Sequence, residues 1–154
     1  MDLSRRTIFP HNAAAMPSPS PRPVDPCPCA RLDARGRARS YAACCGPHRE
    51  PGAAVPAPDA EALMCSRYTA FVRGDVAHLL ATWHASTRPA ELTLEPAVTW
   101  LGLEVRRHRA LDADRAEVEF VARSRVAGRG QRLHEVSRFV REGGRWFYVD
   151  GDVR

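Results

Sequence analysis

The stretch that decides the fold is Asp59–Asp75, DAEALMCSRYTAFVRGD. Its larger side chains return every three or four residues, the spacing that places them on one face of an α-helix. The residues with this spacing are Leu63, Arg67, Tyr68, Phe71 and Val72. Asp59 can accept the free amide hydrogens of a first turn, and Gly74 can take the left-handed conformation that ends many helices. The sequence therefore predicts a helix that begins after Asp59 and ends at Gly74.

A second, shorter helix is predicted after Asp75, which is another good N-cap. Its apolar face is expected to hold Val76, Leu79, Leu80 and Trp83. The chain beyond it alternates as strands do, with successive side chains on opposite faces. Three rows are expected to share a face: Leu101, Leu103 and Val105; Ala116, Val118, Phe120 and Ala122; Leu133, Glu135, Ser137 and Phe139.

Turns separate these rows at 112–114 and 128–130, and Gly143-Gly144 between 132–141 and 146–150 is a hairpin signal. Two helices followed by long antiparallel strands make an α+β domain, with the helices packed on one face of a curved sheet.

The first 58 residues have a different composition, with eleven of the thirteen prolines. We expect a disordered proline-rich tail at 1–25, a cysteine-bearing module at 26–50, a linker at 51–58 and the α+β domain at 59–154. Met16 is an alternative start. Neither a membrane span nor a secretory signal is predicted, so a cytoplasmic protein is expected. All 23 basic residues are arginine, and the formal net charge is +5.

Four of the five cysteines form two close pairs, Cys27 with Cys29 and Cys44 with Cys45. Clustered thiols in a cytoplasmic protein indicate a metal site, and zinc prefers four thiolates in a tetrahedron. A site with four protein ligands is structural, because it leaves no open coordination position. His48 in place of Cys45 is the alternative fourth ligand. Four arginines between the pairs can offset the negative charge of such a site: Arg31, Arg35, Arg37 and Arg39.

The segments Cys27–Cys29 and Ser40–Pro47, CPC and SYAACCGP, resemble the SEC-C zinc motif of the SecA translocase tail. Further segments resemble the bacterial YchJ-like family: 62–71, 80–84, 86–89, 118–120, 134–135 and 146–151. The resemblance implies a SEC-C module followed by a nuclear transport factor 2-like (NTF2-like) cone. Two positions depart from the family pattern. Ala30 stands where the family has glycine, at the start of a longer loop, and Cys65 stands where it usually has arginine.

Cones of this kind often enclose a pocket, so the side chains expected near its interior are candidates for ligand binding. They are Arg67, Tyr68, Trp83, His84, Trp100, Glu135 and Tyr148; His134 and Asp150 are further polar candidates. Strand parity places Glu135 inward, with Arg67 as its expected partner, and His134 outward. His84 is expected to cap a helix end, and the aromatic residues to be core. No residue is predicted to be catalytic.

Three functional hypotheses follow. The first is a non-enzymatic adaptor whose zinc module contacts a protein partner, by analogy with the SecA tail. The alternative is a small-molecule enzyme of the isomerase or hydrolase type, with its site in the cone. The third, direct binding of nucleic acid, rests on the arginines of residues 31–39.

Overall fold

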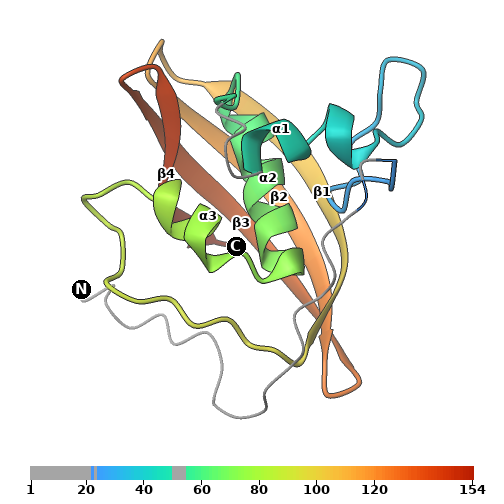
Figure 1. Ribbon diagram of the computed structural model, residues 1–154. Coiled ribbons are helices and arrows are strands. Elements are labelled where there is room, and N and C mark those ends of the chain that lie inside the picture. The colour runs from blue at the N-terminus through green and yellow to red at the C-terminus, as the bar shows by residue number, and fades with distance from the viewer. Residues whose placement is uncertain (1–21, 23, 50–54) are drawn as a thin grey trace.

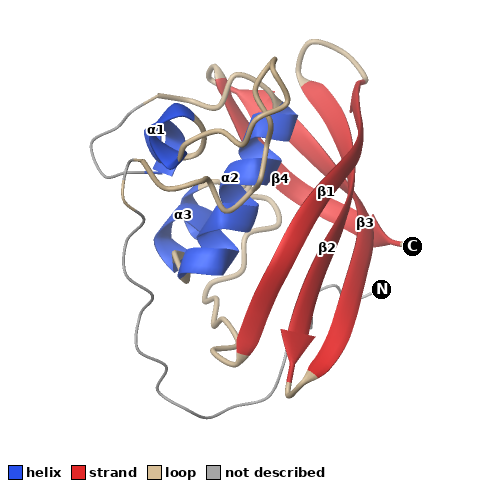
Figure 2. Cartoon of the chain, turned by 90° about the vertical axis from the view of Figure 1, so that its right-hand side faces the viewer, coloured by secondary structure: helices blue, strands red, loops and turns tan. Residues whose placement is uncertain are grey.

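A computed structural model describes residues 22, 24–49 and 55–154. It has two layers, with helices on one face of an antiparallel sheet whose strand order is β1-β2-β3-β4 (Figures 1 and 2). The elements are η1 (Tyr41–Ala43), α1 (Gly46–Arg49), α2 (Ala60–Arg73), α3 (Val76–Ala81), β1 (Val98–Ala110), β2 (Arg115–Val126), β3 (Arg129–Glu142) and β4 (Arg145–Val153). Most of the predicted tail, and 51–54 of the predicted linker, lie outside the described residues.

Both predicted helices are present, with the predicted caps. The carboxylate of Asp59 accepts the amide of Ala62, and Gly74 closes α2 in the left-handed conformation. Asp75 caps α3 in the same way, through the amide of His78. The inclusion of Trp83 in the second helix is wrong. That helix ends at Ala81, and Trp83 instead forms a parallel bridge to Tyr148 of β4.

Three hairpins join the strands, and the predicted turn at Gly143-Gly144 is confirmed, with positive φ at both glycines. The row along β2 from Ala116 to Ala122 is buried as predicted. So are Glu135, Ser137 and Phe139 of β3, whereas Leu133 lies at the exposed end of that strand.

The row predicted for β1 is wrong at Leu101. A β-bulge between Trp100 and Gly102 inserts one extra residue and reverses the alternation. Trp100 and Leu103 therefore pack on the core, while Leu101 is 51% exposed.

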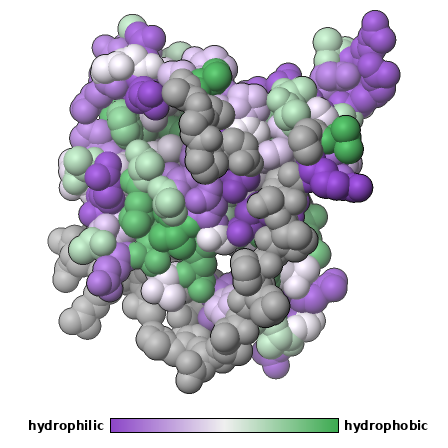
Figure 3. Space-filling view, in the orientation of Figure 1, coloured by the Kyte–Doolittle hydropathy of each residue, from purple (hydrophilic) through white to green (hydrophobic). Residues whose placement is uncertain are grey.

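The helices cover the concave side of the sheet, and α2 lies closest to its centre (Figure 2). One hydrophobic cluster joins α2 and the sheet, and it also includes the four paired cysteines and Tyr41. Figure 3 shows an apolar area around α3, where Val76 and Leu80 are partly buried. None of the helices in the described part of the chain has the length and apolarity to cross a membrane.

Candidate metal centre

Short-range hydrogen bonds shape the chain around each cysteine pair. Cys27–Ala30 forms a turn, in which the amide of Ala30 donates to the carbonyl of Cys27 at 3.0 Å. The amide of Cys27 in turn donates to Arg39 at 2.9 Å, which brings the two ends of the intervening loop together. Ser40 caps η1, and the amide of Cys44 closes that short helix on the carbonyl of Tyr41.

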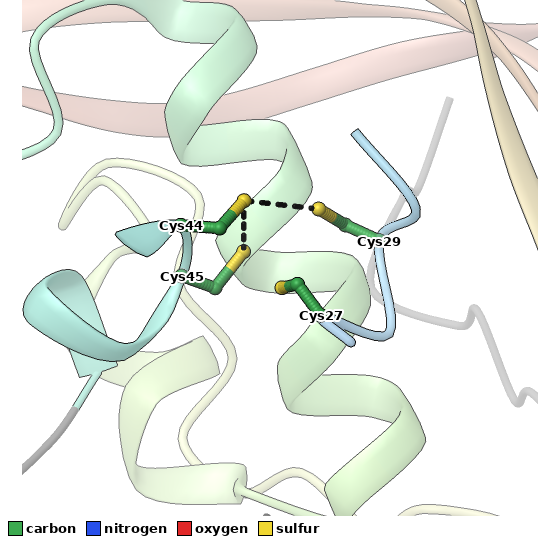
Figure 4. A group of neighbouring side chains, drawn as sticks. All are labelled: Cys27, Cys29, Cys44 and Cys45. Carbon is green, nitrogen blue, oxygen red and sulfur yellow. Dashed lines mark hydrogen bonds between the residues drawn. The ribbon is translucent and has the colours of Figure 1, made fainter. Parts of the chain in front are cut away.

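These turns bring the four sulfurs into one buried group (Figure 4). All four Sγ atoms lie within 4.8 Å of one another; Cys29 and Cys44 are 3.4 Å apart, and Cys44 and Cys45 are 4.0 Å apart. A tetrahedral zinc with bonds of about 2.3 Å needs sulfurs about 3.8 Å apart. The four thiols can therefore hold a metal ion with little rearrangement. No disulfide links them.

The electrostatics of the group also favour a cation. Hydrogen bonds from the thiols of Cys29, Cys44 and Cys45 lower the pKa of Cys27, so one thiolate forms readily. The neighbouring Cys27 raises the pKa of Cys29 to about 12, and the pKa values of Cys44 and Cys45 also rise. A second buried negative charge therefore needs a compensating positive ion.

Helix α2 contributes a polar side chain to this centre. The hydroxyl of Thr69, which is fully buried, donates to Sγ of Cys45 at 3.4 Å and lies 3.8 Å from Sγ of Cys27. Such hydrogen bonds orient metal ligands and stabilise their charged form. Thr69 thus connects the centre to the helix that organises the main core.

Replacing Thr69 by valine keeps the shape of the side chain and removes this hydrogen bond. We expect metal affinity to fall by about 10-fold to 100-fold, because a sulfur ligand loses its donor. Competition with a chromogenic chelator measures this. Thr69→Ser keeps the hydroxyl and is expected to stay much closer to the original affinity. Equal affinities for the valine variant and the unmodified protein would contradict the role given to Thr69.

A buried arginine fixes the second cysteine pair to the helical layer. Arg49 follows the pair on α1; its Nη1 donates to the hydroxyl of Tyr41 at 2.9 Å, and its Nη2 lies 3.0 Å from the carboxylate of Asp75. Asp75 also caps α3, so the same carboxylate serves both segments. Gly46 leaves room for this packing, because a Cβ there would lie 2.9 Å from the carbonyl oxygen of Tyr41.

The loop between the pairs is a small hairpin. Leu32 bridges Ala38, and the carboxylate of Asp33 accepts the amides of Arg35 and Arg37. Ala30, at its start, has φ of +58°. A glycine, the residue that the family pattern has here, can adopt this left-handed conformation without strain, whereas the alanine of this chain is strained in it.

Ala30→Gly is therefore expected to stabilise the protein by about 0.5 to 1 kcal/mol, the relief of left-handed strain less the entropy of a more flexible unfolded chain. Chemical denaturation of the metal-loaded protein measures this difference. Ala43→Gly is a control in the same segment, because Ala43 lies in η1 and is expected to lose stability. No gain from Ala30→Gly would contradict the strain inferred at this position.

His48, the alternative fourth ligand, and Cys65, the fifth cysteine, have different surroundings. Nδ1 of His48 donates to the carbonyl oxygen of Val55 at 2.8 Å, an arrangement that favours Cys45 over His48 as the fourth ligand. Cys65 is buried on α2 but lies outside the group of four sulfurs.

The predicted pocket residues fall into three places. Arg67 is 3% exposed, and its guanidinium carbon lies 4.6 Å from the ring centre of Tyr148 and 5.2 Å from that of Trp83. Nη1 of Arg67 donates to the carbonyl of Leu79 and to the hydroxyl of Thr82. Burial lowers the pKa of Arg67 to about 10, while the charge of Glu135 opposes that change.

Glu135 points inward as predicted and accepts hydrogen bonds from Ser137 at 2.9 Å and Tyr148 at 3.4 Å. Tyr68 and Trp100 form an edge-to-face pair elsewhere, with ring centres 5.7 Å apart. The aromatic candidates are thus packed against neighbouring side chains.

His84 does not cap a helix, contrary to the prediction. Its Nε2 lies 2.8 Å from the carboxylate of Glu142, and its Nδ1 lies 2.6 Å from the hydroxyl of Ser86. These contacts connect the loop after α3 to the end of β3. His134 contacts Glu119 of the neighbouring strand at 2.7 Å, and Asp150 pairs with Arg138 at 2.6 Å.

A half-open cavity of about 280 Å³ lies beside the cysteines, between the hairpin that joins the two cysteine pairs, α2 and β1. Its lining residues are Cys29, Ala30, Arg31, Leu32, Arg39, Glu61, Cys65, Leu103 and Val105. None of the seven predicted ligand-binding residues is among them.

Sequence reasoning missed Thr69, Arg49 and Asp75 as parts of this centre. The one local signal in the sequence was the hydroxyl of Thr69, which lies one helical turn after Cys65 on a mostly apolar face of the predicted helix. The contact from Arg49 to Asp75 spans 26 residues and has no local signature.

Comparison with known proteins gives the family. Residues 59–151 match the family model "YchJ, middle NTF2-like domain". UPF0225 proteins from Polaromonas sp. and Polaromonas naphthalenivorans are 60% and 62% identical. The alignments cover 83% and 82% of this chain and 93% and 96% of theirs.

Two solved structures have a similar fold. A SEC-C motif containing protein from Rhodopseudomonas palustris is 30% identical, with a TM-score of 0.66 over 77% of this chain and 95% of that one. Another, from Psychrobacter arcticus, is 28% identical, with a TM-score of 0.67 over 86% and 84%. With its NTF2-like domain and its four-cysteine group, this chain belongs to the YchJ-like family.

Proposed function

We propose that this protein is a non-enzymatic adaptor, in which a structural zinc ion holds the N-terminal segment in shape to contact a protein partner. The observation that carries the proposal is the closed character of the centre. All four cysteines are buried and point at one another, so an ion among them has no free position for substrate. Zinc suits this donor set because it binds four thiolates tetrahedrally without redox chemistry.

The hairpin that begins at Cys29 supports a contact role. It projects from the helices and sheet in Figure 1, and its two ends are held at Cys29 and Cys44. Leu32 is 57% exposed, and Arg35 and Arg37 beside it are exposed as well. Arginine is enriched in protein interfaces, and the exposed side chain of Leu32 adds apolar area that a partner can bury. A partner with an acidic rim around an apolar depression fits this hairpin.

Crosslinking in cells followed by mass spectrometry tests the proposal. The test variant is Leu32→Ser with Arg35→Glu and Arg37→Glu, which leaves the cysteines intact. We expect it to keep its zinc and lose the partner's crosslinks. The matched control is Leu101→Ser with Arg107→Glu and Arg145→Glu, which makes the same changes at exposed positions of the sheet. Partner crosslinks that survive in the hairpin variant would overturn the proposal.

A further inference from the structure

The hairpin of β2 and β3 ends in a cluster of four exposed arginines, Arg123, Arg125, Arg129 and Arg132. We call this cluster the basic hairpin. Arg129 lies opposite Val126 beside the turn and has the parity of the other face. Arg123 lies directly opposite Arg132, and Arg125 lies two residues further along β2 on the face that these two share. This face is the one turned away from the helices. The turn lies at the opposite end of the sheet from the cysteine-bearing segment (Figures 1 and 2).

The positive charge of the basic hairpin is poorly balanced within the chain. Among the ion pairs of residues 22, 24–49 and 55–154, one reaches it, from Glu104 to Arg123 at 3.4 Å, and Glu104 also contacts Arg106. Further along the same face, charges are paired, as in His134 with Glu119 and Arg138 with Asp150. Like charges directly opposite across two strands destabilise a sheet. The cluster is therefore a place where a polyanion would relieve repulsion.

The strands around the cluster carry glycines, which leave the backbone accessible between the arginine side chains. Gly130 lies opposite Arg125, and Gly102 of β1 lies opposite Arg123. A Cβ added at either glycine would meet no atom within 4 Å, so packing does not require a glycine there. A phosphate backbone can approach the strands closely at these positions and meet the guanidinium groups, whose planar donors match phosphate oxygens.

We propose that the basic hairpin binds the phosphate backbone of duplex nucleic acid without reading its sequence. Residues 123–132 contain no aromatic side chain, whereas surfaces for single strands stack bases on aromatic rings. Residues 123–132 themselves present no large exposed apolar side chain, but Leu101 and Leu133 next to them are exposed, so the test below includes membrane vesicles. This surface is separate from the cysteine centre and from the exposed hairpin at Leu32.

Fluorescence anisotropy with a labelled duplex of about 20 base pairs tests this, using the full zinc-loaded chain. Three phosphate contacts, from Arg123, Arg125 and Arg132, predict a slope of roughly −3 for log affinity against log salt between about 50 and 200 mM. In the variant Arg123→Gln, Arg125→Gln, Arg129→Gln, Arg132→Gln, we expect at least a tenfold loss of affinity and a much flatter slope.

The matched control removes the same charge at four other exposed arginines: Arg107→Gln, Arg109→Gln, Arg145→Gln and Arg154→Gln. This control variant is expected to keep most of the affinity for the duplex. Thermal unfolding and zinc content that match those of the unmodified protein establish that both variants fold. Equal losses in the two variants would overturn the proposal, since binding would then follow net charge alone. A protein that does not bind the duplex at about 50 mM salt would also overturn the proposal. So would a protein that binds phosphatidylserine vesicles but not the duplex.

Discussion

The variant Cys45→Ser is expected to lose its metal ion and to release the N-terminal segment from α2. The segment has little apolar core of its own, because its buried cysteines and Tyr41 belong to the cluster that includes α2 and the sheet. In small zinc modules, metal binding supplies of the order of 10 kcal/mol of folding free energy. The sheet should remain folded, since Val118, Phe120 and Phe139 share their buried cluster with residues of α2 as well as with the cysteines.

Hydrogen exchange distinguishes this partial unfolding from global unfolding. The amides of Cys27, Cys44 and His48 donate to carbonyls within the segment and are expected to lose protection in Cys45→Ser. Amides in the paired centres of β2 and β3 are expected to stay protected. Cys65→Ser is the control, because Cys65 is a buried thiol outside the metal group. Identical protection of the segment in Cys45→Ser and the unmodified protein would show that the metal does not hold it.

The variant Arg67→Met is expected to lower the free energy of unfolding by about 3 kcal/mol or more. The change leaves the carbonyl of Leu79 and the hydroxyl of Thr82 without their charged donor, and it removes a positive charge that acts on the buried Glu135. It also removes the stacking of the guanidinium on Trp83 and Tyr148.

Urea denaturation of the metal-loaded protein measures this loss. Arg67→Lys is the informative control, since it keeps the charge and removes the planar fork. We expect lysine to restore only part of the stability. Full stability in the lysine variant would show that charge alone matters, and full stability in the methionine variant would contradict a structural role for Arg67.

The sequence predicted the elements whose signals are local. Asp59 and Gly74 bound α2 because caps act within one turn, and Gly143-Gly144 makes its turn for the same reason. The four sulfurs could be predicted as one site because two pairs close in sequence have few other uses in such a chain.

The errors arose where a distant contact decided the local structure. The bulge at Gly102 moves Leu101 to the outer face, and the alternation of apolar residues in β1 does not predict this bulge. His84 was assigned to a helix end, yet its backbone amide donates to Tyr148 of β4 and its ring contacts Glu142. The contribution of Thr69 to the metal centre required the docking of two segments that sequence reasoning treated as separate.

We expect a metal ion in the four-cysteine group to hold the N-terminal segment on α2. Native mass spectrometry of the intact chain, before and after a strong chelator, tests it most directly when the same samples are followed by hydrogen exchange. The account predicts one zinc ion per chain, lost together with the protection of Cys27 and Cys44 and restored with it on adding zinc. A metal-free chain that keeps this protection would contradict it.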